Sequence, residues 1–232
     1  MGRARRLAWE VISVVNEAST MRKALRIGVP KGSLFADSVA ALERCGLPVG
    51  CLKDPGRQLI FREEGYEFII LRPTDVPTFV ALGGADCAIC GEDSIIEADM
   101  DVVEMVDLGF GGCRFVVAEP RASSDSVTDT YARLGVMKVA TKYPNITRAY
   151  YDSIGTQVEI VKLHGNIELA PLCQMADRIV DITATGTTLR ENNLEIVADV
   201  LESTARFLAN PAALRIDPRI RDLAMRLDEE TK

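Results

Sequence analysis

A turn rich in hydroxyl side chains follows an apolar segment in the second half of the chain. Residues 179–183 predict a buried strand, and residues 187–192 have the composition to begin a helix. A strand-to-helix turn around Gly186 would expose unpaired backbone N–H groups at the positive end of that helix. The residues that could donate hydrogen bonds to an anion there are Thr183, Ala184, Thr185, Gly186, Thr187 and Thr188. These features predict a phosphate site, although an ordinary capped turn fits the same residues.

One acidic side chain and three cations extend this chemistry. Asp181 lies in the strand just before the turn, where its carboxylate could accept hydrogen bonds from sugar hydroxyls. Lys31 follows the first predicted strand, Arg57 follows a Pro-Gly turn, and Arg72 ends another buried strand. A solvated loop charge is the alternative for Arg57, and an ion pair with Asp75 is the alternative for Arg72. With the phosphate turn, Asp181 would suit an anionic ligand that carries a sugar, and the structural alternatives for these residues remain open.

The candidate residues sit at the ends of elements that alternate along the whole chain. Strands are predicted at residues 25–29, 68–71, 86–90, 113–118, 136–140, 158–163, 179–183 and 195–200. Helices are predicted at residues 34–45, 74–82, 145–153 and 168–175, and two more helical segments close the chain. Such alternation is typical of an α/β protein with largely parallel sheets.

Two lobes with a cleft between them follow from this order. Residues 119–130 contain proline, serine and aspartate in the proportions of an exposed connection, which indicates a lobe boundary. We therefore expect an N-terminal extension at residues 1–24 and a first lobe made of residues 25–118 and 195–232. The second lobe is expected at residues 119–194 and contains the phosphate turn. Clefts between lobes are common ligand sites.

Composition and charge exclude two classes of protein. The chain has 232 residues, of which 47% are hydrophobic and 26% are charged, and these values are typical of a globular protein. Its apolar segments are far shorter than the roughly 20 residues that a membrane helix needs, so we expect no membrane span. Its net charge of -7 argues against a dedicated nucleic-acid-binding protein. An acidic chain can still build a locally positive pocket.

The six cysteines do not predict disulfides or a metal centre. They are scattered along a chain that shows no secretion signal, so we expect reduced thiols and a cytoplasmic protein. Cys87 and Cys90 form a C-x-x-C pattern, but residues three apart on a strand point to opposite faces. A single histidine, His164, makes a Cys/His metal cluster hard to assemble.

Several short motifs, taken in order, resemble one enzyme family. The pattern Asp181-x-x-x-Thr185-Gly186-x-Thr188-Leu189 is similar to the phosphoribosyl diphosphate (PRPP) loop of the ATP phosphoribosyltransferases. Further matches lie at residues 29–32 (VPKG), 55–61 (PGRQLIF), 71–77 (LRPTDVP), 84–86 with 91–93, 162–171 (KLHGNIELAP) and 176–181. Each motif is weak alone, but their order over residues 25–207 is specific.

The resemblance implies a fold and a reaction. The fold would be two-lobed and like the type II periplasmic binding proteins, with a cleft between the lobes. The reaction would transfer the phosphoribosyl group of PRPP to N1 of ATP, the first step of histidine biosynthesis. It would release pyrophosphate and would use Mg²⁺ held mainly by the substrate phosphates, without a certain protein metal site.

The same resemblance assigns roles to individual residues. Arg57, Lys31 and Arg72 would be the catalytic cations that stabilise the leaving pyrophosphate. The PRPP site would consist of Asp181, Glu168, Thr183, Ala184, Thr185, Gly186, Thr187 and Thr188. The ATP site would consist of Gly32, Ser33, Asp75, Gly91 and Asp93. Helix capping is an alternative role for Asp93, and a helix N-terminal position is one for Glu168.

The chain departs from the family pattern at two positions. Ser33 stands where the family usually has an arginine that would contact substrate phosphates, which changes the expected anion contacts. Gln174 stands where a glycine is usual, in the helix before the PRPP strand, and we expect this change to affect packing only.

The resemblance is to the short form of the family, because only residues 211–232 follow the last strand-like segment. It implies a regulatory partner that resembles histidyl-tRNA synthetase, assembled with the catalytic chain as a hetero-octamer, and a homodimer when the catalytic chain is alone. A solute-binding protein and a purine or orotate phosphoribosyltransferase are the alternatives. The first would not need the PRPP loop, and the second usually has two adjacent acids where Asp181 is followed by Ile182.

Overall fold

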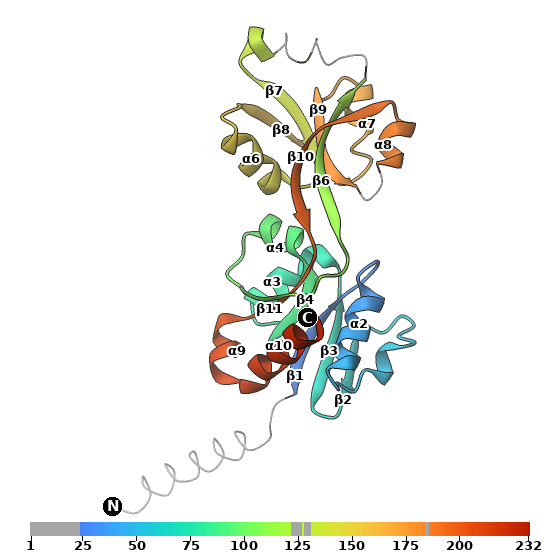
Figure 1. Ribbon diagram of the computed structural model, residues 1–232, viewed down its shortest axis with the longest axis vertical. Coiled ribbons are helices and arrows are strands. Elements are labelled where there is room, and N and C mark those ends of the chain that lie inside the picture. Colours follow the sequence, from blue (N-terminus) through green and yellow to red (C-terminus); the bar gives the residue numbers. More distant parts are fainter. Residues whose placement is uncertain (1–23, 122–126, 128–130, 184–185) are drawn as a thin grey trace, which may run out of the picture.

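The computed structural model describes residues 24–121, 127, 131–183 and 186–232, and these residues form two lobes, each built on its own β-sheet (Figure 1). The six-stranded sheet of the first lobe has the order β2-β3-β1-β4-β11-β5, and the five-stranded sheet of the second has the order β10-β6-β9-β7-β8. The prediction of a two-lobed α/β protein is therefore confirmed.

Each strand and helix has well-defined bounds. The strands are β1 (Leu25–Pro30), β2 (Ile60–Glu63), β3 (Tyr66–Leu71), β4 (Cys87–Gly91), β5 (Val103–Asp107), β6 (Cys113–Pro120), β7 (Met137–Thr141), β8 (Val158–Lys162), β9 (Arg178–Thr183), β10 (Leu194–Ser203) and β11 (Ala205–Ala209). The helices are α2 (Phe35–Arg44), α3 (Val76–Ala81), α4 (Glu92–Ala98), α6 (Pro144–Ser153), α7 (Leu169–Leu172), α8 (Thr187–Glu191), α9 (Pro211–Ile216) and α10 (Pro218–Glu230), with short 3-10 turns η1 (Gly50–Leu52) and η2 (Pro73–Asp75).

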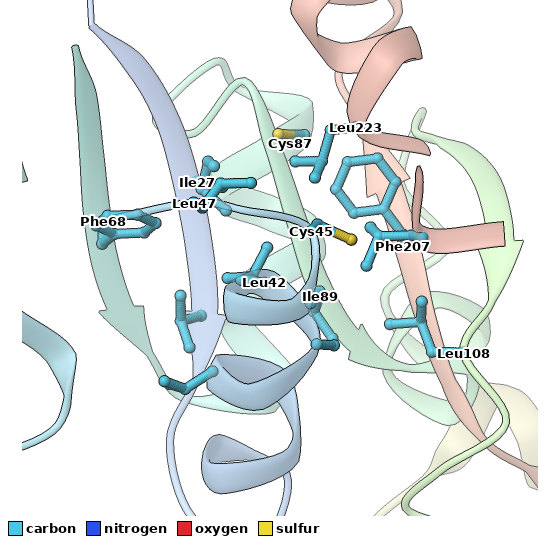
Figure 2. Packing of buried hydrophobic residues seen from close by; sticks show 14 of the residues in the cluster. Ile27, Leu42, Cys45, Leu47, Phe68, Cys87, Ile89, Leu108, Phe207 and Leu223 are labelled. Carbon is cyan, nitrogen blue, oxygen red and sulfur yellow. The ribbon is translucent and has the colours of Figure 1, made fainter. Parts of the chain in front are cut away.

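The sheet of the first lobe combines parallel and antiparallel pairing. Strands β3, β1 and β4 run parallel, whereas β2 and β11 pair antiparallel with their neighbours. Figure 2 shows the main core, in which Leu42 from α2 and Leu223 from α10 pack against Ile27, Ile89 and Phe207 of the sheet. Helices α3 and α4 cover the opposite face of the sheet. The lobe is thus a three-layered α/β unit.

The C-x-x-C pair lies in β4, as the sequence predicted. Both thiols are buried, and Cys87 packs in the core under α2 and α10 while Cys90 packs in the core on the other face. Burial raises the pKa of both thiols above the ordinary value. These cysteines are therefore small apolar core residues and not a redox or metal pair.

The second lobe repeats the arrangement around strands β7, β8 and β9, which run parallel. Strand β6 pairs antiparallel with both β9 and β10. On this lobe Arg178 forms a salt bridge of 2.6 Å between its Nε and Oε2 of Glu119, whose side chain is only 2% exposed. The ion pair joins β9 to β6 inside the lobe.

The lobe boundaries differ from the predicted ones. Strands β6 and β10 pair from Leu194 opposite Pro120 to Ser203 opposite Cys113, so the second lobe spans residues 113–203 instead of 119–194. Residues 119–130, which suggested a boundary, begin at the far end of β6. Each strand runs without a break from the crossing into the second lobe, and no glycine or proline in its interior marks the place where the chain leaves the first sheet.

The chain crosses between the lobes twice, through residues 108–112 and through Thr204 (Figure 1). The crossings lie side by side: the N–H of Leu108 donates to the carbonyl of Ala205 at 2.8 Å, and the N–H of Ala205 donates to the carbonyl of Phe110 at 2.9 Å. Gly111 adopts a φ of 68°, a conformation that favours glycine.

Within the described part of the chain, no helix combines the length and apolar character that crossing a bilayer requires.

Candidate active site between the lobes

A cavity of about 600 Å³ lies between the two lobes. Its first-lobe wall comes from the turns that follow β1, β3 and β4, and its second-lobe wall comes from the residues after β7 and within β9. The carboxyl ends of the parallel strands of each sheet therefore converge on one space, the usual ligand position in open α/β sheets. The lining residues are Ser33, Leu34, Arg72, Pro73, Thr74, Gly91, Asp93, Ser94, Gly111, Gly112, Cys113, Lys142, Tyr143 and Ile182.

A second cavity of about 450 Å³ adjoins the same turn after β1. Lys31 and Gly32 line it together with Arg57, and the next residue of the turn, Ser33, lines the larger cavity. The side chains of Lys31 and Arg57 are exposed to solvent. Two of the three predicted catalytic cations therefore share one cavity, and the third, Arg72, lines the other.

The predicted phosphate turn follows β9. Gly186 adopts a φ of 68°, and its N–H donates to Oγ1 of Thr183 at 2.7 Å. Thr187 and Thr188 are exposed at the start of α8, where Arg190 Nη2 donates to Oγ1 of Thr187 at 3.1 Å. Ala184 and Thr185 lie outside the described residues. The turn thus presents exposed hydroxyl groups, a guanidinium and a helix start.

Asp181 lies immediately before this turn in a partly buried position. Its Oδ1 accepts a hydrogen bond of 2.8 Å from the N–H of Ile182, a residue that lines the cleft. Burial is the main cause that raises the pKa of Asp181, the neighbouring carboxylate of Glu168 raises it further, and Lys142 opposes the shift. The structure therefore brings the predicted acids Asp181 and Glu168 within electrostatic reach of each other.

The predicted ATP-site residues divide into those at the cleft and one away from it. Gly91 and Asp93 line the larger cavity, and Asp93 Oδ1 accepts a hydrogen bond of 3.0 Å from Oγ of Ser203, the last residue of β10. Asp75 is exposed at the end of η2 and does not line either cavity. No ion pair joins the side chains of Arg72 and Asp75, both of which the structure describes.

Several cleft residues were not predicted from the sequence. Lys142 and Tyr143 line the cavity from the second lobe, and residues 111–113 line it at the crossing. A usable signal existed for Lys142, because it follows β7, the first parallel strand of the second lobe, as Lys31 follows β1, the first parallel strand of the first lobe. Tyr143 is buried, and its backbone N–H donates to Oγ1 of Thr141 at 2.9 Å.

The carboxylate oxygens near the phosphate turn are suitable ligands for a cation such as Mg²⁺ that is also bound by the phosphates of a substrate. Within the described ranges, no group of three or more His, Cys, Asp or Glu side chains is placed to hold a metal ion. Asp181 and Glu168 nevertheless supply two carboxylates beside the turn. Mg²⁺ is commonly bound by one or two carboxylates together with substrate phosphates, so these residues fit a magnesium–diphosphate ligand.

Comparison with known proteins connects this geometry to one family. The family model described as HisG, ATP phosphoribosyltransferase, matches residues 72–229. The ATP phosphoribosyltransferase of Rubrobacter xylanophilus is 49% identical over 194 residues, which cover 84% of this chain and 90% of that protein. The enzyme of Moorella thermoacetica is 48% identical, with 84% and 87% covered.

Solved structures agree with these relatives. The ATP phosphoribosyl transferase (HisG:HisZ) complex from Thermotoga maritima contains a chain that matches with a TM-score of 0.73 and 30% identity, over 89% of this chain and 98% of that one. The alkanesulfonate-binding protein SsuA from Xanthomonas axonopodis pv. citri matches with a TM-score of 0.53 and 13% identity over 89% and 72% of the two chains, a likeness of fold alone. The fold resembles that of the periplasmic binding proteins, as expected, and the chain belongs to the ATP phosphoribosyltransferase (HisG) family.

Proposed function

We propose that this protein transfers the phosphoribosyl group of PRPP to N1 of ATP, giving phosphoribosyl-ATP and pyrophosphate in the first step of histidine biosynthesis, in the cytoplasm. The observation that carries the proposal is the cleft between the carboxyl ends of the two sheets. One wall leads to the phosphate turn and Asp181, and the other carries Arg72 and adjoins the cavity of Lys31 and Arg57. A sugar phosphate and a nucleotide can thus meet between the lobes.

The second lobe holds PRPP in this proposal. The 5-phosphate binds to the turn of residues 183–188, where backbone N–H groups and threonine hydroxyls donate to its oxygens. Asp181 accepts hydrogen bonds from the ribose hydroxyls, and Glu168 stands beside it. Binding at several points fixes the direction in which C1 of the ribose faces the cleft, which supplies the orientation that the displacement needs.

The chemical step makes little demand on acids or bases of the protein. The lone pair of adenine N1 forms a bond to C1, and the C1–O bond to the diphosphate breaks with its electron pair leaving on pyrophosphate. Lys31, Arg57 and Arg72 stabilise the charge that develops on that leaving group. Mg²⁺ would supply further neutralisation of the diphosphate, and Asp181 or Glu168 would hold it from the protein side.

The proposal includes a partner subunit. The Thermotoga maritima structure is a complex named HisG:HisZ, and this chain covers 98% of the matching chain in it. We infer that the present chain likewise assembles with a regulatory subunit that resembles histidyl-tRNA synthetase, in a hetero-octamer, and that it forms a homodimer when alone.

The test of the proposal is formation of phosphoribosyl-ATP from ATP, PRPP and Mg²⁺, followed by absorbance with a pyrophosphatase present to remove the product. We expect activity from the purified chain and PRPP binding by calorimetry. Absence of both, with and without the partner subunit, would contradict the transferase and favour a solute-binding role on the same fold.

The variant Asp181→Asn is expected to change stability and PRPP binding in opposite directions. Because burial raises the pKa of Asp181 in the folded chain, the charged carboxylate destabilises the fold at every pH above the unfolded value of 3.8. We expect the variant to unfold at a higher temperature than wild type at pH 7, and the difference to disappear near pH 4. We also expect PRPP binding to weaken by about 10- to 100-fold, since a hydrogen bond to a charged group contributes roughly 1.5–3 kcal/mol.

Thermal unfolding at several pH values and calorimetry with PRPP check both expectations. Asp152→Asn is the matched control, because Asp152 is exposed on α6 in the same lobe, and this change should alter neither quantity. Unchanged PRPP affinity in Asp181→Asn would remove Asp181 from the ribose site.

A further inference from the structure

A contact between the lobes joins α4 to α6 away from the two crossing strands. Oε2 of Glu97, near the end of α4, accepts hydrogen bonds from the backbone N–H groups of Asn145 at 2.9 Å and Ile146 at 3.1 Å. In return, Nδ2 of Asn145 donates to the backbone carbonyl of Glu97 at 2.8 Å. In Figure 1, α4 at the top of the lower lobe and α6 at the bottom of the upper lobe face each other.

Each helix supplies the cap that the other helix needs. Helix α6 begins with Pro144, which has no N–H, and its N-cap residue Tyr143 makes no side-chain cap. The next two N–H groups belong to Asn145 and Ile146, and Glu97 accepts from both. A carboxylate at this position is also stabilised by the positive end of the helix. The carbonyl of Glu97 lies in the last turn of α4, where carbonyls lack intrahelical partners.

The two capped helices both lead directly to the cleft. The first turn of α4 carries Asp93 and Ser94, which line the larger cavity from the first lobe. The residues just before α6, Lys142 and Tyr143, line it from the second lobe. The contact made by Glu97 therefore joins the two helices that lead to opposite walls of the cavity.

The protein surroundings of Glu97 stabilise its charged carboxylate less than water would, so the pKa of Glu97 is raised. Burial is the largest cause that raises its pKa, while the hydrogen bonds from Ile146 and Asn145 and the charges of Lys162 and Arg148 act in the opposite direction. A partly desolvated carboxylate is costly unless its hydrogen bonds are made. Opening of the lobes would break both backbone hydrogen bonds and leave the start of α6 without its cap.

We propose that Glu97 is a positioning residue that holds the two lobes together through the start of α6 and thereby places Lys142 against the bound substrates. The part of this inference that concerns substrates rests on the proposed function, whereas the part that concerns the lobes does not. Asn145 acts as the reciprocal half of the same contact. Because the substrates also draw the lobes together, removal of Glu97 lowers the fraction of molecules that are ready to bind, which raises the apparent dissociation constant.

The test compares Glu97→Ala, Glu97→Gln, Asn145→Ala and the double alanine variant in the full chain. In small-angle X-ray scattering without substrates, we expect a larger radius of gyration for Glu97→Ala than for wild type. We expect KM for PRPP and ATP to rise about 10-fold with kcat nearly unchanged, because two hydrogen bonds to a carboxylate are lost. Glu97→Gln keeps an acceptor oxygen and should restore most of both quantities. Glu229→Ala, at an exposed position on α10, is the control.

The two alanine changes should not add in the double variant, because they remove halves of one contact. A lower unfolding temperature in Glu97→Ala with unchanged scattering and unchanged KM would show a merely structural role and overturn the proposal. A wild-type chain without transferase activity would contradict the proposed function, and the scattering comparison would still decide whether Glu97 holds the lobes together.

Discussion

Replacing Arg57 with alanine is expected to reduce the rate of phosphoribosyl transfer by about 100- to 1,000-fold, the usual effect of removing one group that stabilises developing charge. Arg57 follows a Pro-Gly turn, is exposed to solvent and lines a cavity together with Lys31. The guanidinium is therefore free to approach an anion that enters from the cleft. Because its side chain is exposed, the fold should be unaffected, and the unfolding temperature of the variant should equal that of wild type.

Steady-state kinetics with saturating ATP and PRPP measure this effect. We expect the loss to appear in kcat, since the interaction with pyrophosphate strengthens as the C1–O bond breaks. Arg57→Lys should recover part of the rate because it keeps the charge but not the planar fork. Arg133→Ala, an exposed arginine of the second lobe, is the matched control. A near wild-type kcat in Arg57→Ala would exclude Arg57 from the leaving-group site.

Replacing Arg178 with methionine is expected to lower the free energy of unfolding by about 3 kcal/mol, because it leaves the carboxylate of Glu119 buried without its ion-pair partner. The side chain of Glu119 is 2% exposed, so water cannot replace the lost guanidinium. The change lies in the second lobe between β6 and β9. Urea unfolding at pH 7 measures the difference from wild type.

The double variant Arg178→Met with Glu119→Leu provides the control for this prediction. Replacing both members of a buried ion pair by apolar residues is often close to neutral. We therefore expect most of the lost stability to return in the double variant. Equal stability of wild type and Arg178→Met would mean that the ion pair contributes nothing to the fold.

The parallel strands and the turns after them could be predicted from local sequence. Strands β1, β7 and β9 are apolar segments that end at a turn, and Gly186 does have the positive φ that a sharp turn requires. Strands β2, β5 and β11, which were not predicted, carry weaker signals. Strand β2 alternates between exposed and half-buried residues at the edge of its sheet, and β11 is a short segment of five residues that was not predicted separately from the strand at residues 195–200. Strand β5 pairs only with β11 among the described strands.

Some features of the cleft could likewise be predicted from the sequence, and others could not. Lys31, Arg72 and Asp93 could be named because each follows a predicted strand, and strand ends converge in parallel sheets. The boundary between the lobes could not be predicted, because β6 joins the second sheet through its pairing with β9, and β10 joins it through its pairing with β6, and both pairings are between distant parts of the chain. The contact of Glu97 with Asn145 joins residues 48 positions apart on different lobes, so no local pattern indicates it.

The position of β11 has a consequence for the order in which the lobes are completed during synthesis. This strand lies between β4 and β5, yet it is made after the whole second lobe. When residues 113–203 have left the ribosome, the second lobe has all its strands and can fold as a unit. In the first lobe, the edges of β4 and β5 that pair with β11 stay unpaired until residues 205–209 have been synthesised. Such edges are templates for association with other chains, so the nascent first lobe is the part of this protein most exposed to aggregation.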